Sequence, residues 1–275
     1  MSLAHSLALE IVPVELALPH ERHNSERVDD LIIRLLTEGR LVNPPVATPS
    51  NGRYVILDGA TRLTAFRRLG YPHIILQVVD LYAQQVQMHM WHHLVRGGNP
   101  ASLLAALRRV SGVTWTPAPV ATLQAEPLPY GALAAVIAAD GAGYVAQATE
   151  SNADLLELLH CVVDAYSAWG KVERTLTTDA ELLHRQYADW AGLVLLPRYS
   201  VEAVLDLAAR GRTVPAGITR FLIPGRILRL NAPLARLAAA DSLEEKRAWL
   251  ERLLAEKLAH RQARYYEEPV FLLDE

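Results

Sequence analysis

Apolar residues in the first eighty positions recur at two spacings, one typical of short strands and one typical of amphipathic helices. These spacings predict an extended segment at 9–16, a helix at 25–36, strands at 45–48 and 54–57, a helix at 60–69 and a strand at 74–79. Asn51-Gly52 lies between the two middle strands, as in a hairpin, and Gly39 and Gly70 follow the two helices. This part of the chain is predicted to form a compact α/β unit.

Beyond residue 80 the pattern continues with longer helical runs and less regular strands. It predicts helices at 84–95, 101–110, 152–169, 200–210 and 242–264, and strands or extended segments at 114–119, 192–196, 218–223, 226–230 and 269–273. Ser200 is a suitable N-cap, and Ser242-Leu-Glu-Glu245 has the form of a capping box. Pro224-Gly225 between two strand-like runs is typical of a hairpin.

The segment Arg96-Gly-Gly-Asn-Pro100 interrupts the pattern and marks a domain boundary. We therefore predict a mixed α/β (α+β) fold with two domains, 1–99 and 100–275. No internal repeat or low-complexity tract is visible in the sequence.

Composition narrows the class of protein. The 275 residues are 51% hydrophobic and 21% charged, which suits a globular protein with a sizeable core. A net charge of −3 lacks the basic excess of a protein that binds nucleic acid mainly through phosphates, so nucleic acid is an unlikely partner by charge. The single cysteine, Cys161, excludes an intrachain disulfide and is expected to be buried as a small hydrophobic residue. No targeting segment or membrane span is visible, which predicts a cytoplasmic protein without membrane contact.

The candidate chemistry lies where the strand ending at Asp58 meets the next helix. Gly59 lets the backbone approach closely, and the first N–H groups of the helix, at Ala60, Thr61 and Arg62, point into the same space. This arrangement is typical of an anion site. Asp58 can hold a metal, orient a hydroxyl or cap the helix. The alternative, in which Asp58 is only a cap and Arg62 only a surface charge, is equally compatible with the local spacing.

The run from Asp58 to Arg62, followed by Ala65 and Leu69-Gly70, resembles the phosphate-binding turn of the ParB/sulfiredoxin-like superfamily. That superfamily includes DNA-binding partition proteins, sulfiredoxins and free serine kinases. Sulfiredoxins have a cysteine within this turn, and here the position is Ala60. Partition proteins add a helix-turn-helix domain and a basic surface, and neither is visible here.

Similarity to the free L-serine kinases of siderophore-precursor pathways extends through both halves of the chain. It is carried by Ile11-Val-Pro-Val14, His20-Glu21, the run from Gly52 to Gly59, Leu69-Gly70, Trp91, the run from Val214 to Phe221, Gly225-Arg226, Leu230 and Pro233-Leu234. The resemblance implies transfer of a phosphoryl group from ATP or ADP, with Mg²⁺, to L-serine, giving O-phospho-L-serine. It also implies an active site in the cleft between the two domains. The alternative is a ParB-like DNA-binding regulator or a nucleotide-binding partition-type protein, and a homodimer is left open.

The same resemblance assigns roles in the first domain. Glu21 is implied as the general base that activates the serine hydroxyl, and Asp58 as the residue that orients this hydroxyl or holds Mg²⁺. Gly59, Ala60, Thr61 and Arg62 are implied to bind the phosphoryl group. Relatives usually have histidine where this chain has Thr61, so no imidazole is available at this position and the hydroxyl of threonine takes its place.

Further positions are implied to bind substrate. Thr219 and Arg220 are expected to bind phosphate or the amino-acid carboxylate, with a cross-strand hydroxyl and a surface arginine as the plain alternative. Trp91 and His93 fall near a tryptophan-containing segment of the relatives and are placed in the nucleotide or serine pocket. His89 and His93 are four residues apart on a predicted helix, a spacing that can bind a metal, but without a third ligand we favour packing and hydrogen bonding.

Overall fold

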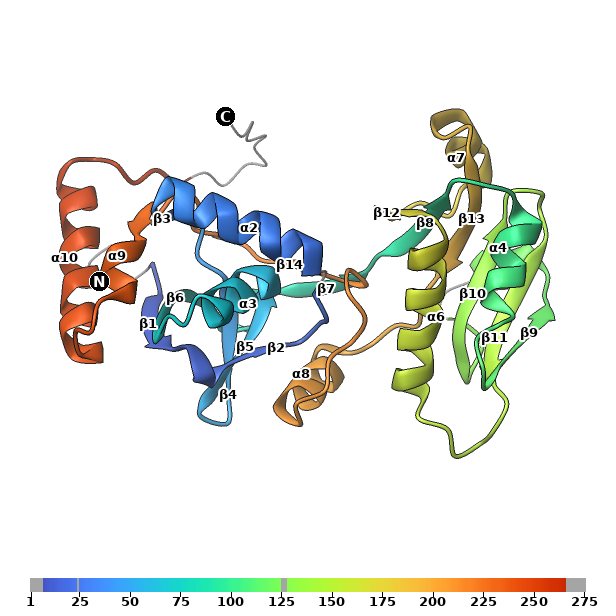
Figure 1. Ribbon diagram of the computed structural model, residues 1–275, viewed down its shortest axis with the longest axis horizontal. Helices are drawn as coiled ribbons and strands as arrows, with labels where there is room; N and C mark the ends of the chain where they lie inside the picture. Colours follow the sequence, from blue (N-terminus) through green and yellow to red (C-terminus); the bar gives the residue numbers. More distant parts are fainter. Residues whose placement is uncertain (1–6, 24, 125–127, 266–275) are drawn as a thin grey trace. The chain divides into compact units, whose positions relative to one another are not determined.

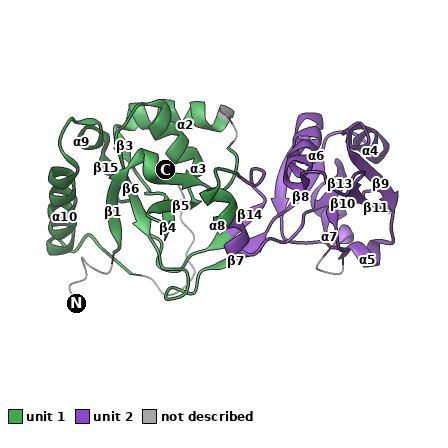
Figure 2. Ribbon diagram, turned by 90° about the horizontal axis from the view of Figure 1, so that it is seen from below, with its two compact units in different colours: residues 1–87, 205–212, 221–275 green, residues 88–204, 213–220 purple. Residues whose placement is uncertain are grey.

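The computed structural model describes residues 7–23, 25–124 and 128–265 (Figure 1). The chain divides into two compact units (Figure 2). The first comprises Met1–Gln87, Leu205–Arg212 and Phe221–Glu275, and the second comprises Met88–Val204 and Thr213–Arg220. The sequence-based division into 1–99 and 100–275 differs from these units, because the last part of the chain returns to the first unit.

The first unit is built on a five-stranded mixed sheet with strand order β1-β6-β4-β5-β2. Its strands are β1 (Leu9–Pro13), β2 (Ala17–Pro19), β4 (Val46–Ser50), β5 (Arg53–Asp58) and β6 (His73–Val78). Strands β4 and β5 form the predicted antiparallel hairpin, whereas β2 runs parallel to β5. A short antiparallel pair joins β3 (Arg40–Leu41) to β15 (Ala232–Pro233).

Helices of the first unit come from distant parts of the sequence. They are the 3-10 helix η1 (Val14–Leu16) and the α-helices α2 (Ser25–Glu38), α3 (Ala60–Arg68), α9 (Leu234–Ala238) and α10 (Leu243–Ala259), with the end of α8 (Val201–Ala209). The buried core contains Ile56, Leu63 and Phe66 together with Leu250 and Leu254 of α10. Burial of this apolar face explains why the C-terminal helix belongs to the first unit.

The second unit is a six-stranded antiparallel sheet with strand order β12-β8-β13-β10-β11-β9. Its strands are β8 (His92–Arg96), β9 (Val113–Pro117), β10 (Ala132–Ala138), β11 (Gly143–Ala148), β12 (Lys171–Thr175) and β13 (Trp190–Leu195). Its helices are α4 (Pro100–Leu107), α5 (Val120–Gln124), α6 (Leu155–Trp169) and α7 (Ala180–Gln186).

Helices cover both faces of this second sheet. Leu123 of α5 and Leu183 of α7 pack with Ile137 on one face. Side chains alternate along a strand, so Val136, next to Ile137, points to the opposite face. On that face the side chains of Val136 and of Leu103 from α4 both lie close to Gly192. Helix α6 lies beside α4 (Figure 1).

Two sequence predictions of secondary structure are wrong. Residues 84–95 are not a helix but contribute β7 (Gln87–Met90) and β8, and the central position of β8 between two strands buries both of its faces. The hairpin at 218–223 and 226–230 does not form. Instead β14 (Thr219–Leu222) pairs with β7, and residues 226–230 are in no strand.

Other predictions have mixed outcomes. The Ser200 hydroxyl accepts the Ala203 N–H, and the capping box of Ser242 is present at the start of α10. Cys161 is exposed on α6, so the prediction that it is buried is wrong. The strand predicted at 269–273 lies outside the described residues. In the part of the chain that the structure describes, none of the helices has the length and apolar character needed to cross a membrane.

Candidate active site

Glu21 and Asp58 follow two neighbouring parallel strands. Strand β2 pairs with β5 so that Ala17 lies opposite Tyr54 and Pro19 opposite Ile56. Extending this register by two residues brings Glu21 to the level of Asp58. The carboxyl ends of parallel strands meet at one edge of a sheet, so both acids lie at the same edge.

His20 fixes the backbone immediately before Glu21. Its side chain is 2% exposed, and its Nδ1–H donates to the Ile56 carbonyl at 2.5 Å. The ring also packs edge-on against Phe221, with 5.3 Å between ring centroids. The other ring nitrogen, Nε2, lies 3.9 Å from Oε2 of Glu21, whose side chain is partly exposed. Glu21 is therefore an accessible carboxylate on a well-anchored loop.

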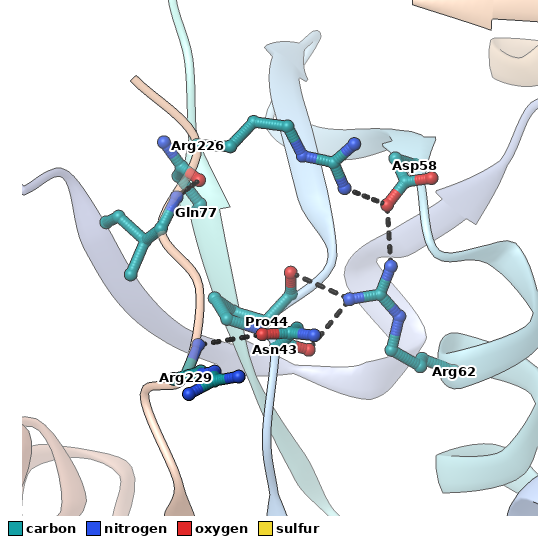
Figure 3. A network of polar contacts seen from close by, with 8 residues as sticks. Asn43, Pro44, Asp58, Arg62, Gln77, Arg226 and Arg229 are labelled. Atoms are coloured by element: carbon teal, nitrogen blue, oxygen red, sulfur yellow. Dashed lines mark hydrogen bonds and ion pairs between the residues drawn. The ribbon is translucent and has the colours of Figure 1, made fainter. Parts of the chain in front are cut away.

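Asp58 does not cap helix α3. The N-cap position is Gly59, with φ of 97°, and no side chain caps this helix end. Instead Oδ2 of Asp58 accepts hydrogen bonds from Nη2 of Arg62 at 2.6 Å and from Nη2 of Arg226 at 2.5 Å (Figure 3). The alternative in which Asp58 is only a cap and Arg62 only a surface charge is therefore wrong.

Arg62 ties helix α3 to the segment before β4. Its Nη1 donates to the carbonyl oxygens of Asn43 at 2.7 Å and Pro44 at 3.0 Å (Figure 3). The side chain is only 20% exposed, and its Nε faces the position that a side chain on Gly59 would occupy. Arg62 thus closes the turn over Gly59.

Arg226 reaches the same carboxylate from a segment far away in the sequence. The buried Gln77 holds this segment on both sides of Arg226. Its Nε2 donates to Gly225 O at 2.9 Å, and its Oε1 accepts from Ile227 N at 2.8 Å. Figure 3 shows Gln77 and Arg226 in this network. Sequence reasoning did not assign Arg226 or Gln77 to the site. The available signal was the Gly225-Arg226 match to the serine kinases.

The electrostatics of this network favour an anion. Burial raises the pKa of Asp58, but the guanidinium groups of Arg62 and Arg226 outweigh burial and hold this pKa below its ordinary value. Burial lowers the pKa of Arg62, and the Asp58 carboxylate opposes that change. Two cations around one carboxylate leave an excess positive charge beside the N-terminal N–H groups of α3.

A magnesium ion fits this edge of the sheet when protein carboxylates and nucleotide phosphates hold it together. Among the described residues there is no group of three or more histidine, cysteine, aspartate or glutamate side chains placed to hold a metal. Glu21 and Asp58 together offer carboxylate oxygens at one sheet edge, which suits Mg²⁺ that is held partly by nucleotide phosphates. Asp58 as a metal ligand stays a prediction.

Gly59→Ala should destabilise the protein by about 1–3 kcal/mol, because φ of 97° is strained for alanine and the new Cβ would lie 2.9 Å from Pro45 Cβ and from Arg62 Nε. Thermal and urea unfolding measure this loss. Gly70→Ala is the matched control, since Gly70 ends the same helix with φ of 69° and no atom within 4 Å of the added Cβ. Equal losses in the two variants would show that the close approach at Gly59 contributes nothing.

The second unit assembles the other predicted residues. The Trp91 N–H donates to Ile218 O at 2.9 Å, and the Arg220 guanidinium lies over the Trp91 ring at 4.8 Å from its centroid. This cation–π contact orients Arg220. Thr219, buried on β14, lies between these two contacts in the chain. Trp91, Thr219 and Arg220 are therefore brought close together, while their roles in substrate binding stay predictions.

His93 is buried and fixes the backbone just before Thr219. Its Nδ1 accepts from the Tyr166 hydroxyl at 2.6 Å, and its Nε2–H donates to Gly217 O at 2.9 Å. Burial lowers the pKa of His93 to about 4, so the ring is neutral at pH 7. His89 and His93 lie on strands β7 and β8, so the helical metal spacing is absent. The favoured alternative, packing and hydrogen bonding, describes His93.

Tyr166→Phe should destabilise the protein by about 1–3 kcal/mol, because it leaves the buried Nδ1 of His93 without its donor. Thermal unfolding measures the change, and Tyr130→Phe is the control, because Tyr130 is fully exposed. An unchanged melting temperature in Tyr166→Phe would contradict a supporting role of this hydrogen bond.

The sequence and the fold of this chain are similar to those of known proteins. No family model matches the chain. The chain is 28% identical over 268 residues to the ATP-dependent L-serine kinase SbnI of Staphylococcus aureus, covering 97% of each protein. The structure of C-terminally truncated SbnI from the same organism superposes with a TM-score of 0.74 at 26% identity, covering 94% of this chain and all of that one. The chain is a relative of the L-serine kinases.

A free serine kinase in complex with AMP shares the fold, with a TM-score of 0.71 at 19% identity over 84% of this chain and 94% of that chain. The resemblance stated from the sequence and the mixed α/β fold class are thereby confirmed. Glu21, Asp58 and the turn from Gly59 to Arg62 lie in the first unit of this relative of the serine kinases. Trp91, His93, Thr219 and Arg220 lie in the second. That both groups line one cleft stays a prediction, as do their individual roles.

Proposed function

We propose that this protein is a free L-serine kinase that transfers the γ-phosphoryl group of ATP to the hydroxyl of L-serine, giving O-phospho-L-serine and ADP. The observation that carries this proposal is similarity over 97% of the chain to a protein named ATP-dependent L-serine kinase. The anion-binding network around Asp58 supplies a chemical reason for it. ADP as the donor, with AMP as the second product, is the alternative within the same proposal.

The serine hydroxyl is a weak nucleophile at neutral pH, so its proton must be accepted during transfer. In this proposal Glu21 accepts the proton, and Asp58 at the same sheet edge orients the hydroxyl. A new bond forms between the serine Oγ and phosphorus, and the bond from phosphorus to the bridging oxygen of the donor breaks. The nucleoside diphosphate leaves with the electron pair of that bond.

Charge on the phosphoryl oxygens is stabilised by fixed donors. The N–H groups of Ala60, Thr61 and Arg62 and the hydroxyl of Thr61 lie at the start of α3, and the positive network adjoins them. Mg²⁺, held by the carboxylates together with the nucleotide phosphates, would supply further neutralisation of charge. Thr219 and Arg220 would bind the amino-acid carboxylate or the product phosphate.

The test is serine-dependent consumption of nucleotide. Purified protein with Mg²⁺ and ATP should form ADP only when L-serine is present, and O-methyl-L-serine, which lacks the hydroxyl, should give none. A parallel series with ADP, followed by formation of AMP, identifies the donor. Nucleotide turnover that is independent of L-serine with both donors would overturn the proposal.

The DNA-binding alternative predicts salt-sensitive binding to duplex DNA, with a slope that reports several phosphate contacts. A mobility-shift titration on the same preparation is expected to show no shift. Use of O-phosphoserine as a precursor for cysteine or siderophores belongs to the same proposal and follows only from the resemblance.

A further inference from the structure

The two arginines that bind Asp58 differ in how many of their donors are already used. The guanidinium group of Arg62 makes three hydrogen bonds, to Asn43 O, Pro44 O and Asp58 Oδ2. Its side chain is 20% exposed. Arg226 donates to Asp58 Oδ2 through Nη2, and its side chain is 37% exposed. An arginine has five N–H donors, so Arg226 has more of them available to a ligand.

The backbone around Arg226 is held while its side chain extends from it. Gln77 is 2% exposed and bonds to the residues on both sides of Arg226, at Gly225 O and Ile227 N. Such a clamp fixes the starting point of the side chain and leaves its long aliphatic part free to redirect the guanidinium. The guanidinium group of Arg62, in contrast, is bound to the carbonyl oxygens of Asn43 and Pro44. Moving it toward a ligand would break these hydrogen bonds and leave both carbonyl oxygens without this donor.

We propose that Arg226 is the arginine side chain that binds the phosphate of the product and of the transferring group, and that Arg62 is a positioning residue. This inference rests on the proposed serine kinase function and names the ligand contact within that site. Without ligand, Asp58 holds the guanidinium of Arg226 beside the N-terminal N–H groups of α3. A phosphate oxygen then binds the unused N–H donors of Arg226, for which guanidinium geometry is well suited.

Arg62 thereby loses one of the roles that the resemblance implied for it. The Arg62 side chain no longer binds phosphate directly, while its backbone N–H at the helix start still can. Loss of the Arg62 side chain should therefore act mainly on the fold of the turn. Loss of the Arg226 side chain should act mainly on the ligand.

The test compares three alanine variants: Arg226→Ala, Arg62→Ala and Arg229→Ala. Arg229 is the matched control, because it lies on the same segment and its backbone N–H, not its side chain, bonds to Asn43 Oδ1 at 2.8 Å (Figure 3). Calorimetry measures affinity for O-phospho-L-serine and for inorganic phosphate without metal, and thermal unfolding measures stability. Arg226→Ala should weaken O-phosphoserine binding about 10- to 100-fold, as expected for loss of charge-assisted hydrogen bonds, with little change in melting temperature.

Arg62→Ala should lower the melting temperature more than either other variant, and Arg62→Lys serves if the alanine variant does not fold. Arg229→Ala should match wild type in both measurements. Wild-type affinity for O-phosphoserine in Arg226→Ala would overturn the inference, as would a larger loss of affinity in a stable Arg62 variant. If the protein makes no O-phosphoserine, the proposed function fails, but the affinity for inorganic phosphate still tests the role of Arg226. That role is contradicted if the wild-type protein binds no phosphate, or if Arg226→Ala binds phosphate as tightly as wild type.

Discussion

Glu21→Gln is expected to lower turnover with L-serine by about 10²- to 10⁴-fold, the usual contribution of a positioned general base. Glutamine keeps the size of the side chain but cannot take the proton from the serine hydroxyl. Nucleotide affinity should stay close to that of wild type, because Glu21 acts on the acceptor and not on the donor. Steady-state kinetics with separate determination of nucleotide binding measures both quantities.

A matched control for this variant is Glu15→Gln, since Glu15 is an exposed carboxylate in η1 of the same unit. It should retain full turnover. The loop that carries Glu21 is anchored through His20, so Glu21→Gln should also keep the wild-type melting temperature. Full turnover in Glu21→Gln would remove this residue from the mechanism.

Asp58→Asn is expected to lower turnover by about 10²-fold, the scale of loss that follows when reacting groups are misplaced by about 1 Å. Asparagine can still accept a hydrogen bond but carries no charge, so Arg62 and Arg226 lose the negative charge that they share. Phosphate binding without metal should be kept or become tighter, because a negative charge next to the anion site is removed. Rate measurements and phosphate calorimetry on this variant test both expectations.

The same substitution has a pH signature. The pKa of Asp58 is held below its ordinary value, so its ion pairs stabilise the folded protein at neutral pH, and this stabilisation is lost as the pH falls through the lowered pKa. Asp58→Asn should lack this component of acid-induced destabilisation. Asp29→Asn, which removes an exposed ion pair to Arg68, is the control and should change turnover little. Near-normal turnover in Asp58→Asn would contradict any catalytic role of the acid.

Elements with a strong local signal were predicted from the sequence. The Asn51-Gly52 turn joins β4 and β5 as expected, and both Asn51 and Gly52 have positive φ. Helix α3 begins directly after Gly59, and α6 ends at Gly170. In each case the residues that define the element are neighbours in the sequence, so composition and spacing are enough to identify it.

The errors occur where distant residues decide the outcome. The run from 84 to 95 has helical spacing of apolar residues, but β8 pairs with β12 on one side and β13 on the other and is buried in the sheet. Arg226 joins Asp58 across 168 positions, and no local pattern marks such a contact. Within 226–230, the Ile227 N–H donates to the Gln77 side chain and the Arg229 N–H to the Asn43 side chain, instead of to a partner strand of a hairpin.

The most direct test of the serine kinase proposal is phosphorus NMR of one reaction mixture that contains the protein, L-serine, ATP and Mg²⁺. The account predicts a growing resonance at the position of authentic O-phospho-L-serine, in step with loss of the γ-phosphate signal of ATP and appearance of ADP. The same mixture with Glu21→Gln in place of wild type should show almost no such signal. If no O-phosphoserine forms with ATP, nor with ADP in its place, the assignment of this protein as a serine kinase is contradicted.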